Sequence, residues 1–261
     1  MANTLSAEEE GWVSELLEAC KAENVHVKGK FEAACYVIVS KGDIKKAMTR
    51  LKKIRRIESE EGLDQVDVQE SWDFLDKQQP GCMQAVGLDD EGRVTMYMDY
   101  AAFHPGNIKT PQDWKYMMKA FFNLFDCMTA TIEDVRKGTS FVAQCKGMGF
   151  SNFSLEIEKR FSHVYQDGYP MKFKLIMMVD PPTIINAIIN LCKVFLSKKL
   201  MDRMKCVTSA DVSKHISEDK LPVSYGGTNK ETVREWVARR AAVRKASEGS
   251  FASLKSTVTA M

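Results

Sequence analysis

Asp180-Pro181-Pro182-Thr183, followed by IINAIINLCKVFL (residues 184–196), is the most unusual stretch of this 261-residue chain. On a helical wheel, its polar residues Asn186, Asn190 and Lys193 share one narrow stripe, and apolar side chains cover the rest. A surface helix needs an apolar arc of about 100° facing the core, and the apolar arc of this segment is wider than that. It is too short to cross a bilayer, which takes about 20 apolar residues. The pattern predicts either a buried core helix or a helix that lies against a hydrophobic ligand.

The next segment, SKKLMDRMK (197–205), is basic and is expected to form a second helix. From Lys193 to Lys205, five cations stand against the single acid Asp202, which leaves a net charge of +4. An apolar helix joined to a basic one suits a protein that contacts a hydrophobic ligand and a charged membrane surface. A core helix with a solvated basic tail is the alternative.

Composition places the chain among ordinary soluble globular proteins. Hydrophobic residues make up 44% and charged residues 28%, enough for a sizeable core, and the net charge of +2 favours no particular partner. The seven cysteines are scattered and form no CxxC pair, as expected for reduced thiols. The amino terminus lacks the pattern of a signal peptide, and no window is apolar enough to span a membrane. We therefore expect a cytoplasmic protein with at most peripheral membrane contact.

No motif for catalysis or metal binding stands out. The four histidines lie far apart, and none has a carboxylate or cysteine at ligand spacing. Patterns for a nucleophilic serine, a zinc protease, a phosphate loop or a dinucleotide are missing. The basic stretch 45–56 lacks interleaved aromatic residues, so nucleic acid is not expected as a partner. The sequence predicts a protein that is not an enzyme and needs neither metal nor cofactor.

Hydrophobic periodicity separates a helical part from a part in which helices and strands alternate. Ser6 and Glu9 match a capping box before the first helix, and Asp43 matches a cap of a later one. Strands separated by helical crossovers imply a mostly parallel sheet. The last dozen residues, rich in Ser and Thr, are expected to fray. The expected elements are a helical bundle over 1–60, a two-stranded hairpin over 81–100, strands over 140–145 and 173–179, and helices over 111–135, 154–165 and 230–245.

Three segments follow one another in a specific order: YPMKFKLIMMVDPPTIINAIINLCKVFL (169–196), SKKLMDRM (197–204) and LPVSYGG (221–227). They combine an aromatic-Pro pair, a strand that ends in a turn with proline, an apolar helix, a basic helix and a Leu-Pro-x-x-Tyr-Gly-Gly motif. Together they resemble the second half of a CRAL-TRIO domain, and most closely the branch that binds tocopherol and retinaldehyde. Residues 31–58, with Gly42-Asp43-Ile44 and Ala47, resemble the helical module that precedes this domain in the family.

The resemblance implies an α/β fold with an N-terminal helical bundle and a CRAL-TRIO domain. In such a domain, a mostly parallel β-sheet forms the floor of a hydrophobic cavity, helices flank it, and residues 184–196 would be a mobile gate helix. We expect an N-terminal helical module over 1–65, the ligand-binding domain over 70–228, and a C-terminal helix and tail over 229–261.

The resemblance also implies which residues line the cavity. Phe121 and Phe125 fall where tocopherol-binding members carry small hydroxylated residues, which argues against the same ligand pose. Met-rich walls adapt to irregular ligands, although they are more often plain core. The implied ligand-binding residues are Met118, Phe121, Phe125, Met148, Phe161, Val164, Tyr165, Met171, Ile176, Ile184, Ile185, Ile188 and Leu191.

Three cations beside the expected gate match family positions that hold phosphoinositide head groups: Lys174, Lys199 and Arg203. A fourth cation is expected on the N-terminal module, but Ile38 occupies that position. Lys41 could compensate for it. These residues imply weak, reversible docking on anionic membranes, whereas ordinary solvated lysines are the alternative.

The resulting hypothesis is a cytosolic carrier that encloses a tocopherol-, retinoid- or carotenoid-like lipid under the gate helix and exchanges it at membranes. The alternative is a lipid-sensing module, for phosphoinositide or phospholipid, that acts through a protein partner. The identity of the ligand, the target membrane and the oligomeric state stay open at this point.

Overall fold

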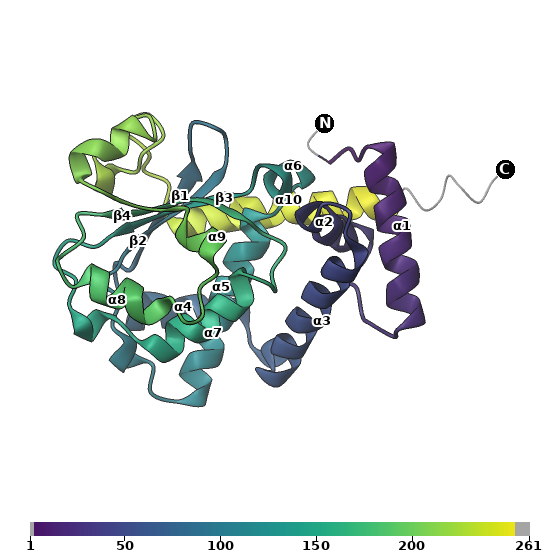
Figure 1. Ribbon diagram of the computed structural model, residues 1–261, viewed down its shortest axis with the longest axis horizontal. Coiled ribbons are helices and arrows are strands. Elements are labelled where there is room, and N and C mark those ends of the chain that lie inside the picture. The colour runs from purple at the N-terminus through teal and green to yellow at the C-terminus, as the bar shows by residue number, and fades with distance from the viewer. Residues whose placement is uncertain (1–2, 254–261) are drawn as a thin grey trace.

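The computed structural model describes residues 3–253 and consists of a helical bundle joined to an α/β part (Figure 1). The bundle contains α1 (Ala7–Ala22), α2 (Lys30–Ser40) and α3 (Ile44–Glu60). Ser6 and Glu9 form the expected capping box, and the Asp43 carboxylate accepts a hydrogen bond from the Lys46 N–H at 2.9 Å. The expected N-terminal bundle is therefore confirmed.

The sheet has five strands in the order β1-β2-β3-β4-β5. β1 and β2 form an antiparallel hairpin, and the other three pairs are parallel. The expectation of a mostly parallel sheet flanked by helices is confirmed. The strands are β1 (Met83–Leu88), β2 (Val94–Asp99), β3 (Thr139–Gln144), β4 (Phe173–Val179) and β5 (Met204–Val207).

Helices connect the parallel strands. Figure 1 shows α4, α5, α7 and α8 together on one side of the sheet, and the segment that follows β5 on the other side. The remaining elements are α4 (Val68–Gln78), α5 (Pro111–Met128), α6 (Ile132–Lys137), α7 (Leu155–Tyr165), α8 (Ile185–Cys192), α9 (Lys198–Met201), α10 (Val233–Ser253) and the short helices η1 (Leu63–Gln65), η2 (Pro105–Asn107), η3 (Phe150–Asn152), η4 (Ser209–Lys214) and η5 (Val223–Tyr225).

Several expected elements have different limits in the structure. The helix expected over 111–135 is divided into α5 and α6, because Thr131 caps a new helix through the Asp134 N–H at 3.2 Å. The basic segment 197–205 is not one helix. It makes a single turn, α9, and then enters β5, whose backbone pairs with the free edge of β4. α4 was not expected at all; its N-cap is Asp67.

α10 joins the two parts of the molecule. Its beginning packs Trp236 into the core cluster under the sheet, and its end packs Phe251 into the core of the helical bundle. Between them, Arg244 donates to the Thr129 carbonyl at 3.0 Å and lies 4.6 Å from the centre of the Phe31 ring. α10 starts and ends later than expected, so residues 250–253 are helical. Residues 254–261, also expected to fray, lie outside the described part.

A close backbone approach in the Tyr-Gly-Gly motif generates a prediction. A Cβ on Gly227 would lie 2.1 Å from the Leu221 carbonyl oxygen and 2.5 Å from its carbonyl carbon, and backbone atoms do not yield easily. Gly227→Ala should therefore lower the free energy of unfolding by about 1–3 kcal/mol, measured by urea denaturation. Gly249→Ala is the control, since nothing lies near that Cβ and alanine should stabilise α10 by up to about 1 kcal/mol. Equal stability of the two variants would contradict the claim that close backbone contact requires glycine at position 227.

Candidate functional site

A cavity lies between one face of the sheet and the helices α5, α7 and α8. Alternate side chains in the middle of β2 and β4 line it: Met96 and Met98 from one strand, and Ile176 and Met178 from the other. The space not filled by atoms, counted with its mouth to solvent, is about 1150 Å³. The strands also contribute Phe141, Phe173 and Met204. The helices and loops contribute Tyr100, Phe103, Met117, Phe121, Phe125, Met148, Phe153, Ile157, Glu158, Phe161, Tyr165, Ile185, Ile188, Ile189, Cys192, Leu196 and Leu200.

The structure brings together most of the residues that the sequence singled out as ligand-binding. The ones that line the cavity are Phe121, Phe125, Met148, Phe161, Tyr165, Ile176, Ile185 and Ile188. Their aromatic members pack against one another at an angle: the ring centres of Phe121 and Phe161 are 4.8 Å apart in an edge-to-face arrangement, and those of Phe121 and Phe125 are 6.0 Å apart. Ligand contact by these residues stays a prediction.

Five of the proposed residues lie outside the cavity lining. Met118, Val164 and Met171 are fully buried in the surrounding core, Ile184 is half-buried before α8, and Leu191 is 46% exposed on the outer face of α8. One position along a helix turns a side chain by about 100°, so Met117 lines the cavity where Met118 was expected.

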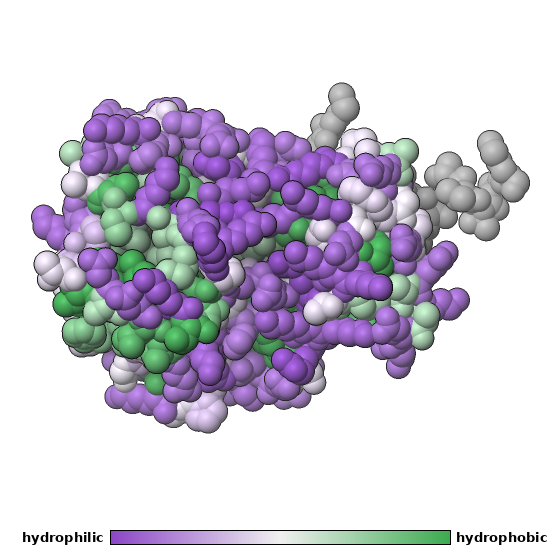
Figure 2. Space-filling model, in the orientation of Figure 1, coloured by the Kyte–Doolittle hydropathy of each residue, from purple (hydrophilic) through white to green (hydrophobic). Residues whose placement is uncertain are grey.

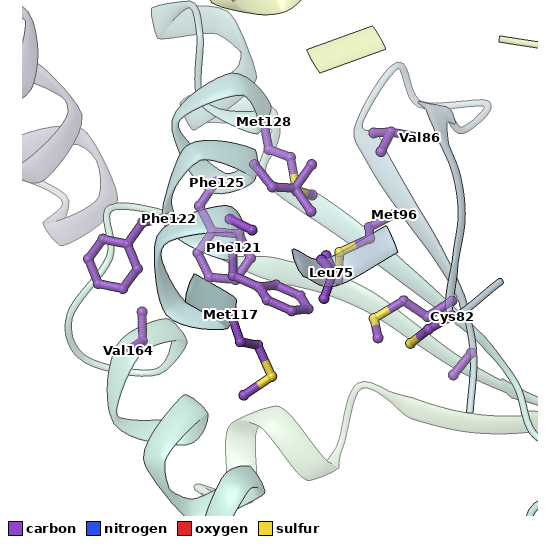
Figure 3. Packing of buried hydrophobic residues seen from close by; sticks show 14 of the residues in the cluster. Leu75, Cys82, Val86, Met96, Met117, Phe121, Phe122, Phe125, Met128 and Val164 are labelled. Carbon is purple, nitrogen blue, oxygen red and sulfur yellow. The ribbon is translucent and has the colours of Figure 1, made fainter. Parts of the chain in front are cut away.

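Figure 3 shows how α5 divides its side chains between cavity and core. Phe121 points from α5 toward the strands, with Met117 beside it. Phe122 leaves the helix on the opposite side, where Val164 of α7 also lies. α5 therefore presents a cavity face and a core face that are both apolar, and hydropathy alone does not separate them.

Sequence reasoning missed two kinds of lining residue. Met96 and Met98 alternate with Thr95 and Tyr97 along β2, and that period of two was a usable signal. Glu158 interrupts the apolar face of α7, and no sequence feature showed that this acid faces inward. Its side chain keeps some accessible surface only because it lines the cavity.

Burial changes the acidity of Glu158. The surrounding apolar wall raises the pKa of its carboxyl to about 7, against the opposing effect of a hydrogen bond from the Tyr100 hydroxyl. The oxygen–oxygen distance of that bond is 3.3 Å. Near neutral pH, the cavity therefore holds a carboxyl group that is protonated in a large fraction of molecules.

α8 closes the cavity through apolar contact alone. Ile185, Ile188 and Cys192 are buried against the lining, and among the described residues no α8 side chain makes a hydrogen bond or ion pair with another element. Leu191 is exposed on its outer face, and Val194, just beyond the helix, is 84% exposed. Apolar surface is visible in this region in Figure 2.

Polar contacts hold the two ends of the α8 segment instead. After the helix, the Gln166 side chain donates to the Phe195 carbonyl at 3.0 Å and accepts from the Ser197 N–H at 2.7 Å. Before it, the Asp180 carboxylate accepts from the Ser209 N–H at 2.8 Å. The middle of the segment, in contrast, is held by apolar contact.

A cluster of cations lies where the helical bundle meets the edge of the sheet. The pKa of Lys172 is lowered to about 8 by burial and by nearby Lys174 and Lys41. The pKa of Lys199 is lowered chiefly by Arg203, with Lys41 and Lys174 contributing. The structure thus brings the three predicted cations together and adds Lys41, whose left-handed backbone (φ 57°) ends α2 there. Arg203 also donates to the Phe173 carbonyl, so part of its role is structural.

The described residues 3–253 contain no group of three His, Cys, Asp or Glu side chains that could hold a metal ion. None of the helices in that range has the length and apolar character needed to cross a bilayer. All seven cysteines are free thiols, and Cys206 is the exposed one.

A mostly parallel sheet with an apolar chamber under a short helix defines a class of α/β lipid-binding domains. Residues 78–227, more than half of the chain, match the family model of the CRAL/TRIO domain, and the chain belongs to this family. The resemblance inferred from the sequence is confirmed. Domains of this family bind or transfer lipids and are generally not enzymes.

Two curated proteins illustrate the relationship. The chain is 23% identical over 120 residues to tyrosine-protein phosphatase non-receptor type 9 of Homo sapiens, which covers 46% of this chain and 20% of the phosphatase. It is 30% identical over 116 residues to alpha-tocopherol transfer protein-like of Homo sapiens, covering 42% of this chain and 34% of the relative. The matched segments thus span only a fifth to a third of these relatives.

Among solved structures, the crystal structure of Sfh5 is similar to this chain with a TM-score of 0.50 and 13% identity. The similarity covers 90% of this chain and 92% of the other. At this identity the likeness establishes the fold and nothing more.

The raised pKa of Glu158 predicts a pH-dependent stability. Between the ordinary value of 4.5 and the folded value of about 7, the folded protein binds more protons than the unfolded chain. The free energy of unfolding should therefore fall as pH rises through this window, by at most about 3 kcal/mol. Glu158→Gln should remove that loss and make the variant more stable than the wild type at pH 8, measured by urea denaturation from pH 4.5 to 8.

Glu156→Gln is the matched control, because Glu156 lies on the same helix with its side chain 81% exposed. Its pH profile should follow the wild type. A Glu158→Gln profile parallel to the wild type would show that the carboxyl does not titrate in an apolar site.

Proposed function

We propose that the protein is a carrier that encloses one hydrophobic lipid beneath α8 and exchanges it at membranes without a cofactor. The observation that carries the proposal is the apolar chamber covered on one side by a helix whose side chains make no hydrogen bond or ion pair to another described helix or strand. A prenyl or polyene lipid suits this wall better than a two-chain phospholipid, because the bulky side chains of Phe121, Phe125 and Phe161 are packed together in it. The free thiols agree with a cytoplasmic location.

Apolar burial is sufficient to retain such a ligand. About 400 Å² of buried apolar ligand surface at roughly 25 cal/mol per Å² contributes on the order of 10 kcal/mol. Association and ordering cost about 4–15 kcal/mol and offset part of it. Movement of α8 then controls release, and contact of exposed Leu191 and Val194 with lipid would lower the cost of that movement.

Ile188→Asp should abolish ligand loading, because it places a charge on the cavity side of α8, where Ile188 is only 6% exposed. Leu191→Asp is the matched control on the outer face of the same helix and should retain loading. Loading is measured by mass spectrometry of organic extracts from the purified proteins, with thermal unfolding as a check of the fold. Normal loading of a folded Ile188→Asp variant would contradict the proposal that α8 covers the bound ligand.

The cation cluster supports docking on anionic membranes. Each Lys or Arg near such a surface contributes about 1 kcal/mol, and salt weakens the attraction. Lys174 and Lys199 are both exposed, and neither is used in an ion pair within residues 3–253. Asp202, the acid closest in sequence to Lys199, is paired with Lys198 at 3.0 Å.

Lys174→Glu combined with Lys199→Glu should weaken binding to vesicles that contain phosphatidylserine at least about tenfold and flatten its salt dependence. Sedimentation with vesicles at several salt concentrations provides the measurement. Lys214→Glu combined with Lys230→Glu is the control with the same change in net charge, since Lys214 lies on η4 and pairs with Asp211 at 2.6 Å, and Lys230 is exposed before α10. Equal losses in both proteins would mean that net charge, and not this cluster, attracts the membrane.

A lipid-sensing module that acts through a protein partner is the second candidate. It is favoured by one observation: in the phosphatase relatives, the matched segment makes up only 20% of the chain. Transfer of ligand between donor and acceptor vesicles separates the two candidates. A carrier moves many ligands per protein molecule, whereas a sensor binds ligand without such turnover.

A further inference from the structure

Polar groups are scarce on the cavity wall, and those present lie together. Of the lining residues, only Tyr100, Glu158, Tyr165 and Cys192 carry a hydroxyl, carboxyl or thiol. Glu158 and Tyr165 are seven positions apart on α7, which places them on one face two turns apart. Tyr100 follows β2 and donates its hydroxyl to Glu158 Oε1.

One carboxyl oxygen of Glu158 has no hydrogen-bond partner among the described residues, and no cation pairs with the carboxyl. Its Oε2 makes no hydrogen bond or ion pair within the part of the chain that the structure describes. The nearby guanidinium of Arg160 is used elsewhere: it pairs with Glu61 at 2.7 Å and lies 3.8 Å from the centre of the Trp114 ring.

The other titratable groups that face Glu158 are neutral. Burial raises the pKa of Cys192 on α8 to about 12 and holds the pKa of Tyr100 and of Tyr165 well above the ordinary value. The carboxyl is therefore surrounded by uncharged groups from β2, α7 and α8. Glu158 lines the cavity, so a bound molecule can make the hydrogen bond to Oε2 that the described protein does not supply.

A lipid hydroxyl satisfies this carboxyl in both protonation states, since it donates to the carboxylate and accepts from the protonated acid. A lipid carboxylate would bring a second negative charge into an apolar chamber, and a hydrocarbon would leave the oxygen without a partner. A protonated amine would have to lose its hydration in the chamber, where the pair with Glu158 offsets only part of that loss.

We propose that Glu158 and Tyr100 form a head-group subsite that binds the hydroxyl of a single-headed lipid and discriminates against lipids that carry a carboxylate. Glu158 is the specificity-determining residue, and Tyr100 orients its carboxyl. The inference rests on the proposed carrier function and specifies the chemistry of its ligand.

The test compares four probes with one hydrocarbon length: oleyl alcohol, oleic acid, oleylamine and 1-octadecene. Each is offered to the full-length protein from neutral phosphatidylcholine vesicles at pH 8, and bound lipid is quantified by mass spectrometry after the protein is recovered. The variants are Glu158→Leu, Glu158→Gln and, as matched control, Glu156→Gln on the exposed side of α7. Thermal unfolding checks the fold of each variant.

The wild type and Glu156→Gln should bind oleyl alcohol at least about tenfold more tightly than oleic acid or 1-octadecene. Glu158→Leu should lose about tenfold in affinity for the alcohol and gain affinity for 1-octadecene. Glu158→Gln should keep most of its affinity for the alcohol and accept oleic acid better than the wild type, because an amide carries no charge.

A Glu158→Leu variant that binds oleyl alcohol like the wild type would overturn the subsite, and so would a wild-type preference for oleylamine. Both results leave the carrier proposal intact. Failure of the wild type to take up any of the four probes would overturn the subsite and the proposed carriage of single-headed lipids together.

Discussion

Apolar contact is the interaction that holds α8 over the cavity, and the candidate site depends on it. α8 covers the chamber with Ile185 and Ile188, and no side-chain hydrogen bond or ion pair to another described element supplements that contact. Apolar contact has no direction, so any other apolar phase can replace it. A ligand can replace it from inside, and lipid can replace it from outside, where Leu191 is already exposed.

The polar interactions lie around this apolar centre and tie the helical bundle to the closing segment. Arg50 of α3 donates to the Gln166 carbonyl at 2.9 Å, and the side chain of the same Gln166 holds the chain just after α8. Lys41, at the end of α2, belongs to the cation cluster beside this junction. Gln166 thus connects the helical bundle to the chain that follows α8.

The chamber is not uniformly apolar. One carboxyl group, that of Glu158, lies in its wall, and its burial lowers the stability of the fold. Glu158 is held among aromatic and aliphatic groups that raise its pKa to about 7, so the folded state loses stability as pH rises. A leucine at this position has no titratable group and would avoid that cost. Buried polar groups that destabilise the fold are typical of functional sites, where stability is exchanged for selectivity.

The sequence by itself determined the secondary structure of the long periodic segments, the mostly parallel sheet and the family, because hydrophobic period and turn chemistry are local properties. Tertiary structure alone decided the rest. β5 exists because β4 offers an unpaired edge, and Met117 replaces Met118 in the lining because the rotation of α5 is set by its neighbours. Glu158 faces Tyr100 for the same reason: the two meet only when α7 packs across the end of β2. These contacts depend on how segments that are distant in the sequence are placed relative to one another, and no local sequence pattern contains that information.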